Sequence, residues 1–113
     1  MAAVPLNRFK TFTKILSTTP EELYPGESDY TTIILMAQIS NTTATTKKVT
    51  FSHVSGATST QLLEQFSIPP YDAVSAITGK LVLESGQTIT AYANVDASVK
   101  VVLSVLETLN GWD

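Results

Sequence analysis

Apolar and polar residues alternate with a period of two along several segments, and turn-forming residues separate these segments. Successive side chains of a β-strand point to opposite faces, so this alternation is typical of strands that bury one face. It is clearest in residues 88–95, where Ile89, Ala91, Ala93 and Val95 alternate with residues that are mostly polar. These four side chains are predicted to face a core.

Two longer segments, 30–41 and 99–109, are apolar on both faces. In the first, one face carries Ile33, Leu35, Ala37 and Ile39, and the other carries Thr32, Ile34, Met36 and Gln38. In the second, Val102 and Leu106 lie on the face opposite the remaining valines. Strands that are covered on both sides have near-continuous apolar sequences. We therefore expect these strands to lie at the centre of a sheet or to be covered by another subunit.

Shorter segments with strand-like composition complete the pattern, and they are residues 9–17, 21–24, 47–54, 60–68 and 79–84. Pro69 and Pro70 cannot donate backbone hydrogen bonds, so they predict an extended connection through Tyr71 and Asp72. Seven or eight short strands, turn signals about every ten residues and no long helical period predict an all-β fold. The expected architecture is a single-domain antiparallel β-sandwich, similar to a jelly roll.

A chain of 113 residues is long enough for one hydrophobic core. We expect residues 20–113 to form the sandwich and residues 1–19 to form an extended arm or an edge strand. The first 16 residues contain Arg8, Lys10 and Lys14 but no acidic residue, whereas acidic residues cluster immediately afterwards. Two interpretations stay open: a solvated edge strand, or an arm that docks on an acidic neighbouring copy.

The composition argues against several classes of partner. Only 15% of residues are charged and the net charge is −3, which is poorly suited to binding a phosphate backbone. The sequence has no cysteine, so disulfides and thiolate metal sites are excluded. The first residues do not resemble a signal peptide, and no apolar run is long enough to cross a bilayer. We therefore expect no nucleic acid or membrane partner, and synthesis in a cytoplasm.

Catalytic chemistry has few candidate residues. His53 is the single histidine, and nothing marks Ser52, Ser55 or a remote serine as a nucleophile. The aspartates show no ligand series of the calcium-loop type, and the isolated glycines do not form a phosphate-binding loop. Glu84 and Glu107 are the nearest pair of carboxylates on strands, and both are expected to point to solvent. No catalytic residue, metal or cofactor is predicted.

Three aromatic residues are candidates for binding. Tyr71 follows Pro70, Tyr92 lies on the polar face of a predicted strand, and Trp112 is close to the C-terminus. Partly exposed aromatic side chains commonly contact sugars or proteins. Each also has an alternative interpretation as a residue that packs against the chain's own fold.

The sequence resembles the small β-sandwich structural proteins of tailed bacteriophages, particularly those of cyanophages. One part of the resemblance is 8–12 followed by 30–43, a strand that ends in a loop of small polar residues. The other is the isoleucine-proline segment 67–73, followed by the strand, glycine turn and strand of 79–93. The resemblance implies a component of the virion that is present in many copies.

We therefore expect a non-enzymatic bacteriophage virion structural protein, a capsid decoration or cement protein or a neck or tail component. It is expected to be made in the host cytoplasm, to form homo-oligomers and to contact other virion proteins of the capsid, neck or tail. A carbohydrate-binding or receptor-binding module, such as a fibre adaptor or tip, is the alternative, and a small hydrolase is disfavoured. The residues expected at the interface are Arg8, Lys10, Lys14, Ile34, Met36, Tyr71, Tyr92, Val102, Leu106 and Trp112.

Overall fold

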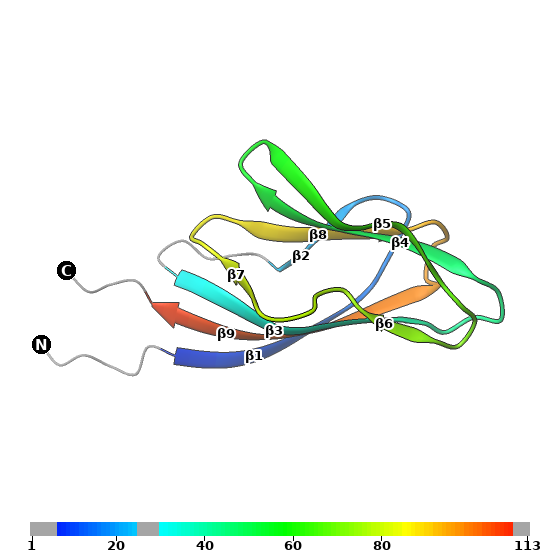
Figure 1. The fold of residues 1–113 in the computed structure, drawn as a ribbon, viewed down its shortest axis with the longest axis horizontal. Coiled ribbons are helices and arrows are strands. Elements are labelled where there is room, and N and C mark those ends of the chain that lie inside the picture. The colour runs from blue at the N-terminus through cyan, green and yellow to red at the C-terminus, as the bar shows by residue number, and fades with distance from the viewer. Residues whose placement is uncertain (1–6, 25–29, 110–113) are drawn as a thin grey trace, which may run out of the picture.

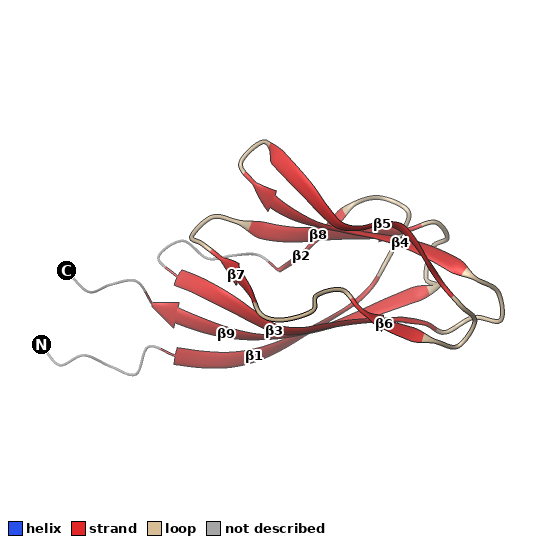
Figure 2. Ribbon diagram, viewed as in Figure 1, coloured by secondary structure: helices blue, strands red, loops and turns tan. Residues whose placement is uncertain are grey.

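The computed structural model describes residues 7–24 and 30–109, which form an antiparallel β-sandwich (Figure 1). Within these residues all regular structure is strand (Figure 2). No helix in the described part of the chain has the length and apolar character needed to cross a bilayer. The strands are β1 (Asn7–Ile15), β2 (Glu21–Tyr24), β3 (Tyr30–Asn41), β4 (Lys47–Ser55), β5 (Thr58–Ile68), β6 (Ala73–Ser75), β7 (Leu81–Leu83), β8 (Thr88–Ala93) and β9 (Val99–Leu109).

The strands form two sheets that pack face to face (Figure 1). The larger sheet has the order β1-β9-β3, and both β6 and β7 pair with the other edge of β3. The smaller sheet has the order β2-β8-β4-β5. Because β7 pairs with the first half of β3 and β6 with the second half, these two short strands together take the place of one strand.

The chain crosses repeatedly between the two sheets. It passes to the other sheet after β1, β2, β3, β5, β7 and β8, and it stays in one sheet at β4–β5 and β6–β7. Strands that are neighbours in the larger sheet are therefore far apart in sequence, as β1 and β9 are. This double-sheet arrangement is a jelly roll. The prediction of an all-β, single-domain antiparallel sandwich is confirmed.

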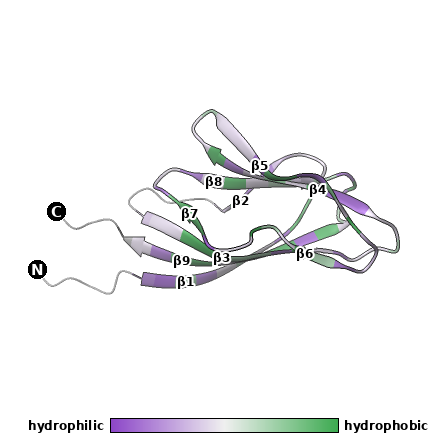
Figure 3. Ribbon diagram, in the orientation of Figure 1, coloured by the Kyte–Doolittle hydropathy of each residue, from purple (hydrophilic) through white to green (hydrophobic). Residues whose placement is uncertain are grey.

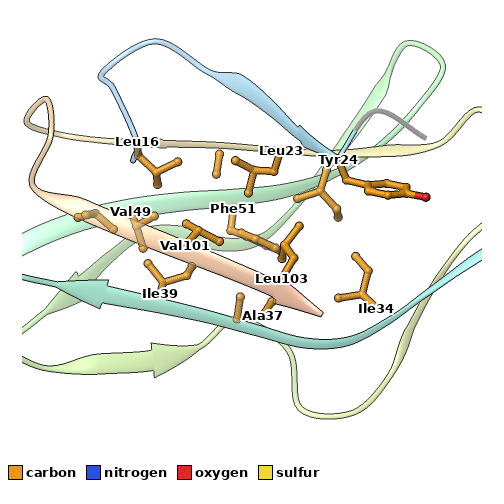
Figure 4. Packing of buried hydrophobic residues seen from close by; sticks show 14 of the residues in the cluster. Leu16, Leu23, Tyr24, Ile34, Ala37, Ile39, Val49, Phe51, Val101 and Leu103 are labelled. Carbon is orange, nitrogen blue, oxygen red and sulfur yellow. The ribbon is translucent and has the colours of Figure 1, made fainter. Parts of the chain in front are cut away.

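The core lies between the sheets and is built from the inward residues of both. In β9 every second residue from Val99 to Val105 is buried, as the alternation predicts. Phe51 of the smaller sheet and Leu103 of the larger sheet point into this space (Figure 4). The predicted core residues of β8 are also buried: Ile89, Ala91 and Ala93.

A β-bulge changes the inward face of β3 halfway along the strand. Leu35 is an extra residue, because its two neighbours pair with consecutive residues of β9. Ile34 is buried before the bulge, and Ala37 and Ile39 are buried after it. The prediction that Ile33 shares one strand face with Ala37 and Ile39 is therefore wrong, since the bulge places Ile33 on the side of the sheet opposite to the core.

Two other local predictions need correction. The segment after Pro69 is a tight turn and not an extended connection, because the Asp72 N–H donates to the Pro69 carbonyl at 3.2 Å. Tyr71 has a φ of 56° in this turn, and Pro70 before it favours the second turn position. Val95, predicted to lie in the core, is 45% exposed because β8 ends before it.

A buried asparagine holds the loops at this end of the sandwich. The Asn41 side-chain amide donates to the carbonyls of Thr45 and Ile68, each at 2.9 Å. Its Oδ1 accepts from the Thr43 N–H at 2.9 Å. Asn41 therefore joins the β3–β4 loop to the end of β5, next to the turn that carries Tyr71.

Candidate functional site

Among the described residues, His53 does not hydrogen-bond to Ser52 or Ser55, the serines nearest to it in the sequence. The described residues also include no group of three or more His, Asp or Glu side chains that could hold a metal ion. His53 Nε2 lies 3.2 Å from Gln87 Oε1, and the Gln87 amide also contacts Ser55 Oγ at 3.2 Å. Ser52 precedes His53 on β4, so the two side chains point to opposite faces of the sheet. The interactions of His53 are those of a structural residue.

An ionic cluster lies between the sheets where β1, β2, β3 and β9 meet. Glu107 is only 1% exposed, although it was predicted to point to solvent. Arg8 Nη2 lies 2.7 Å from Glu107 Oε1, and Lys10 Nζ lies 3.5 Å from the same oxygen. The Tyr24 hydroxyl contacts Glu107 Oε2 and lies 2.7 Å from the Thr32 hydroxyl.

The surroundings of Glu107 favour its ionised form. Burial alone would raise the pKa of this carboxyl, but hydrogen bonds from Tyr24 and Arg8, together with the positive charges of Lys10 and Arg8, lower it below its ordinary value. The Arg8 guanidinium also lies over the ring of Tyr30, 4.2 Å from its centroid. Glu107 is therefore a buried counter-ion that fixes β1 to β9.

This cluster changes the interpretation of the basic N-terminal segment. Figure 3 shows a hydrophilic beginning of β1 and a hydrophobic stretch in β3. Arg8 and Lys10 on β1 are about two-thirds covered and point toward Glu107 of their own chain. Inward-pointing charges are also a common way to protect the edge of a sheet from unwanted strand pairing. Arg8 and Lys10 are thus committed to the fold, whereas Lys14 is exposed.

The outer face of the larger sheet has a different character. Its members are the residues that alternate with the core residues of β1, β9, β3, β6 and β7. They are the odd-numbered residues from Asn7 to Ile15, the even-numbered residues from Lys100 to Thr108, and Thr31, Ile33, Met36, Gln38, Ser40, Ala73, Ser75 and Val82. We call this set the outer face.

An apolar row crosses four strands of the outer face. The strand register pairs Phe9 with Leu106, Leu106 with Ile33, and Ile33 with Val82. Phe9 is 76% exposed and Val82 is 50% exposed, while the two side chains between them are half-buried. Large contiguous apolar patches on protein surfaces are commonly sites of interaction.

Charge is nearly absent from the outer face. Lys100 is its only charged residue, and most of the other members outside the apolar row are threonine, serine, asparagine or glutamine. A sheet face that remains in water is normally polar, and protein surfaces are typically about 25–35% charged. The composition of the outer face therefore differs from that of an ordinary solvated sheet face.

The structure separates the predicted interface residues into several locations. Met36, Val102 and Leu106 lie on the outer face, and Phe9 and Val82, which were not among the predicted interface residues, lie there too. The prediction that Ile34 lies at the interface is wrong. Ile34 is fully buried in the core, because the bulge at Leu35 turns its side chain inward.

The predicted aromatic residues do not come together. Tyr71 is exposed in the turn after β5, and Tyr92 is half-buried on the outer side of the smaller sheet. Trp112 lies outside the described residues. The sequence pattern could have identified Val82, which shares a strand face with Lys80 and Glu84, opposite Leu81 and Leu83. It does not identify Phe9, because alternation with Arg8 and Lys10 would place this apolar side chain toward the core.

The fold and the outer face define the chain as a jelly-roll β-sandwich with one nearly uncharged sheet face. It is similar to a structure of Bacillus endospore appendages, which form a novel family of disulfide-linked pili. The TM-score is 0.54 at 14% identity, and the match covers 92% of this chain and 88% of the other. At this identity the likeness shows a shared fold.

Two crystal structures of a pentameric capsid protein isolated from metagenomic phage sequences also match, each with a TM-score of 0.45 and 17% identity. These matches cover 87% of this chain but only 60% and 61% of the capsid proteins. A scan against protein-family models gives no match, and neither does a search among curated proteins.

Proposed function

We propose that this chain is a non-enzymatic structural protein of a bacteriophage virion, present in many copies, that assembles through its outer face. The observation that carries the proposal is the nearly uncharged outer face with its apolar row of Phe9, Leu106, Ile33 and Val82. The resemblance of the sequence to small tailed-phage sandwiches supports a place in the virion. Jelly rolls are also a frequent fold of viral capsid domains.

A second copy of the chain is the occupant that best fits the outer face. Two copies of this surface would meet with almost no like-charge repulsion, because Lys100 is its single charge. The apolar row also allows a self-complementary contact of the kind that two-fold symmetry requires. A small domain without disulfides gains stability when such a face is buried. Because the sequence has no cysteine, disulfides cannot link the copies.

A charge placed in the centre of the outer face is expected to prevent self-association. Ser104 lies on β9, between Thr11 of β1 and Met36 of β3. In the Ser104→Glu variant, association would bury two unpaired carboxylates, which is strongly unfavourable. We expect an oligomeric wild type and a monomeric Ser104→Glu variant in size-exclusion chromatography with light scattering.

Ser67→Glu is the matched control, because Ser67 is exposed on β5 of the smaller sheet. This variant has the same change of charge and is expected to form an oligomer of the same size as the wild type. Circular dichroism checks that both variants are folded. Equal masses for the wild type and Ser104→Glu, with both folded, contradict assembly through the outer face.

The location within the particle is part of the proposal. Decoration or cement proteins cover the whole shell, whereas neck or tail components lie at one vertex or along the tail. Antibody labelling of purified phage particles, viewed by electron microscopy, separates these positions. Labelling over the shell supports capsid decoration, and labelling at one vertex supports the neck or tail. Particles that carry no label contradict a virion protein.

A further inference from the structure

The outer side of the smaller sheet, on the opposite layer of the sandwich, contains a polar groove. The edge strand β5 has register shifts against β4, and Gln65 within it has a φ of 49°. The Gln65 N–H donates to the Thr50 hydroxyl at 3.1 Å, outside the regular ladder. Thr50 and Ser52 point away from the core but are only 3% and 4% exposed. The irregular strand β5 and its neighbours thus enclose a groove of about 270 Å³.

The side chains of this groove share one kind of chemistry. Thr50, Ser52 and Thr90 supply hydroxyls, Gln61 supplies an amide, and Glu64 supplies a carboxylate. No lysine, arginine or histidine lines it, so the groove offers no positive side chain to an anion. Its lining is also too polar for a purely apolar ligand. Amides, hydroxyls and a carboxylate together suit a ligand that is rich in hydroxyl groups.

Tyr92 adds an aromatic surface to these polar groups. It lies on β8, next to Thr50 in the strand register, and its side chain is half-buried. An aromatic ring provides an apolar face for packing, and its hydroxyl provides a polar edge. A pyranose ring has the matching properties, since its C–H groups form an apolar face and its hydroxyls lie around the rim.

We propose that this groove binds a neutral saccharide. Tyr92 stacks on the sugar ring, and Gln61, Glu64 and Gln65 hydrogen-bond to its hydroxyls. The side chains of these three residues are exposed, and among the described residues none of them has a side-chain hydrogen-bond partner. They are therefore available to a ligand.

The location of the groove makes sugar binding compatible with assembly. The two sheets form opposite layers of the sandwich (Figure 1). The outer face belongs to the larger sheet, and the groove is lined mainly by outward-pointing residues of the smaller sheet. A subunit whose outer face is covered by another copy still presents its groove to solvent. Jelly rolls are also common among lectin domains.

The test is binding of the full chain to an array of neutral and anionic oligosaccharides, followed by titration calorimetry with lactose, cellobiose, maltose and diacetylchitobiose. We expect binding to neutral glycans on the array and to at least one of the four disaccharides. Tyr92→Ala is expected to weaken binding by about tenfold, since aromatic stacking is lost. Tyr71→Ala removes an exposed aromatic residue outside the groove and is expected to bind as the wild type does.

A second measurement does not depend on variants that change stability. In NMR spectra of the wild type, the bound disaccharide is expected to shift the amide signals of Thr50, Ser52 and Thr90. Binding to none of the glycans, preference for anionic glycans, or shifts confined to other parts of the fold overturn the proposal. The monomeric Ser104→Glu variant is expected to keep its affinity for a disaccharide in solution. The proposal of sugar binding and the proposal of assembly can therefore be tested separately.

Discussion

Phe51→Ala is expected to lower the free energy of unfolding by about 4 kcal/mol, which is the cost of removing a fully buried aromatic side chain. Phe51 is fully buried and packs between the two sheets (Figure 4). Truncation loses its hydrophobic burial and leaves a cavity that the surrounding strands fill only in part. Because small domains have a total stability of about 5–15 kcal/mol, this variant is expected to be marginally folded. Urea denaturation followed by circular dichroism measures the change.

Phe66→Ala is the control for this prediction. Phe66 lies on the edge strand β5 and is 41% exposed, so its truncation is expected to cost less than about 1.5 kcal/mol. Similar losses for both variants contradict the assignment of Phe51 to the centre of the core. A smaller loss for Phe51→Ala than for Phe66→Ala contradicts the packing of the two sheets.

Arg8→Met is expected to lower the free energy of unfolding by about 2–3 kcal/mol, because it removes a charged hydrogen-bond partner from a buried carboxylate. Methionine keeps much of the side-chain volume but leaves Glu107 with Lys10 as its remaining cation, 3.5 Å away. The loss is less than that for a fully buried pair, because Arg8 itself is partly exposed. Chemical denaturation at neutral pH measures it.

Lys14→Met is the matched control on the same strand. Lys14 is exposed and does not contact Glu107, so the change is expected to stay within about 0.5 kcal/mol. Equal effects of Arg8→Met and Lys14→Met contradict the role of Arg8 in holding β1 to β9.

The same ionic cluster determines whether the free energy of unfolding rises or falls with pH. The pKa of Glu107 is lower in the folded chain than in the unfolded chain. Its ionised form therefore contributes stability above the ordinary glutamate pKa, and this contribution is lost as the pH falls through the lowered folded pKa. Arg8→Met raises the folded pKa and shrinks the contribution. The stability difference between wild type and Arg8→Met is thus expected to be larger at neutral pH than in acid. An unchanged difference contradicts this account.

Much of the fold follows from local sequence pattern. The strands Tyr30–Asn41 and Val99–Leu109 have the predicted bounds, because long runs with period-two alternation end in turn-forming residues. The jelly-roll class follows from many short strands and the absence of a helical period. The pairing order of the strands does not follow, because β1 and β9 are neighbours through contacts that span most of the sequence.

The predictions that proved wrong or incomplete have physical causes that involve more than one strand. The bulge at Leu35 exists only relative to β9, so the apolar sequence of β3 gives no sign of where the inward face changes. Glu107 looks like a solvent residue in isolation, and its burial depends on Arg8 and Tyr24, which lie far away in the sequence. The polar groove depends on the irregular pairing of β5 with β4.

Part of the apolar surface predicted on the two long strands lies on the outer face. Met36, Val102 and Leu106 lie there, whereas Ile34 is buried in the core. That another polypeptide covers these residues stays a prediction. The fold adds Phe9 and Val82 from two further strands, so scattered apolar residues become a continuous row. Assembly through this row is the central element of the proposed function.

Sedimentation velocity of the unmodified chain over a wide range of concentrations tests that element most directly. The proposed function predicts a sedimentation coefficient that rises with concentration toward a defined oligomer, and a high salt concentration is expected to leave the association intact because apolar contacts dominate it. A single species with the mass of one 12.2 kDa chain at every concentration contradicts self-assembly through the outer face.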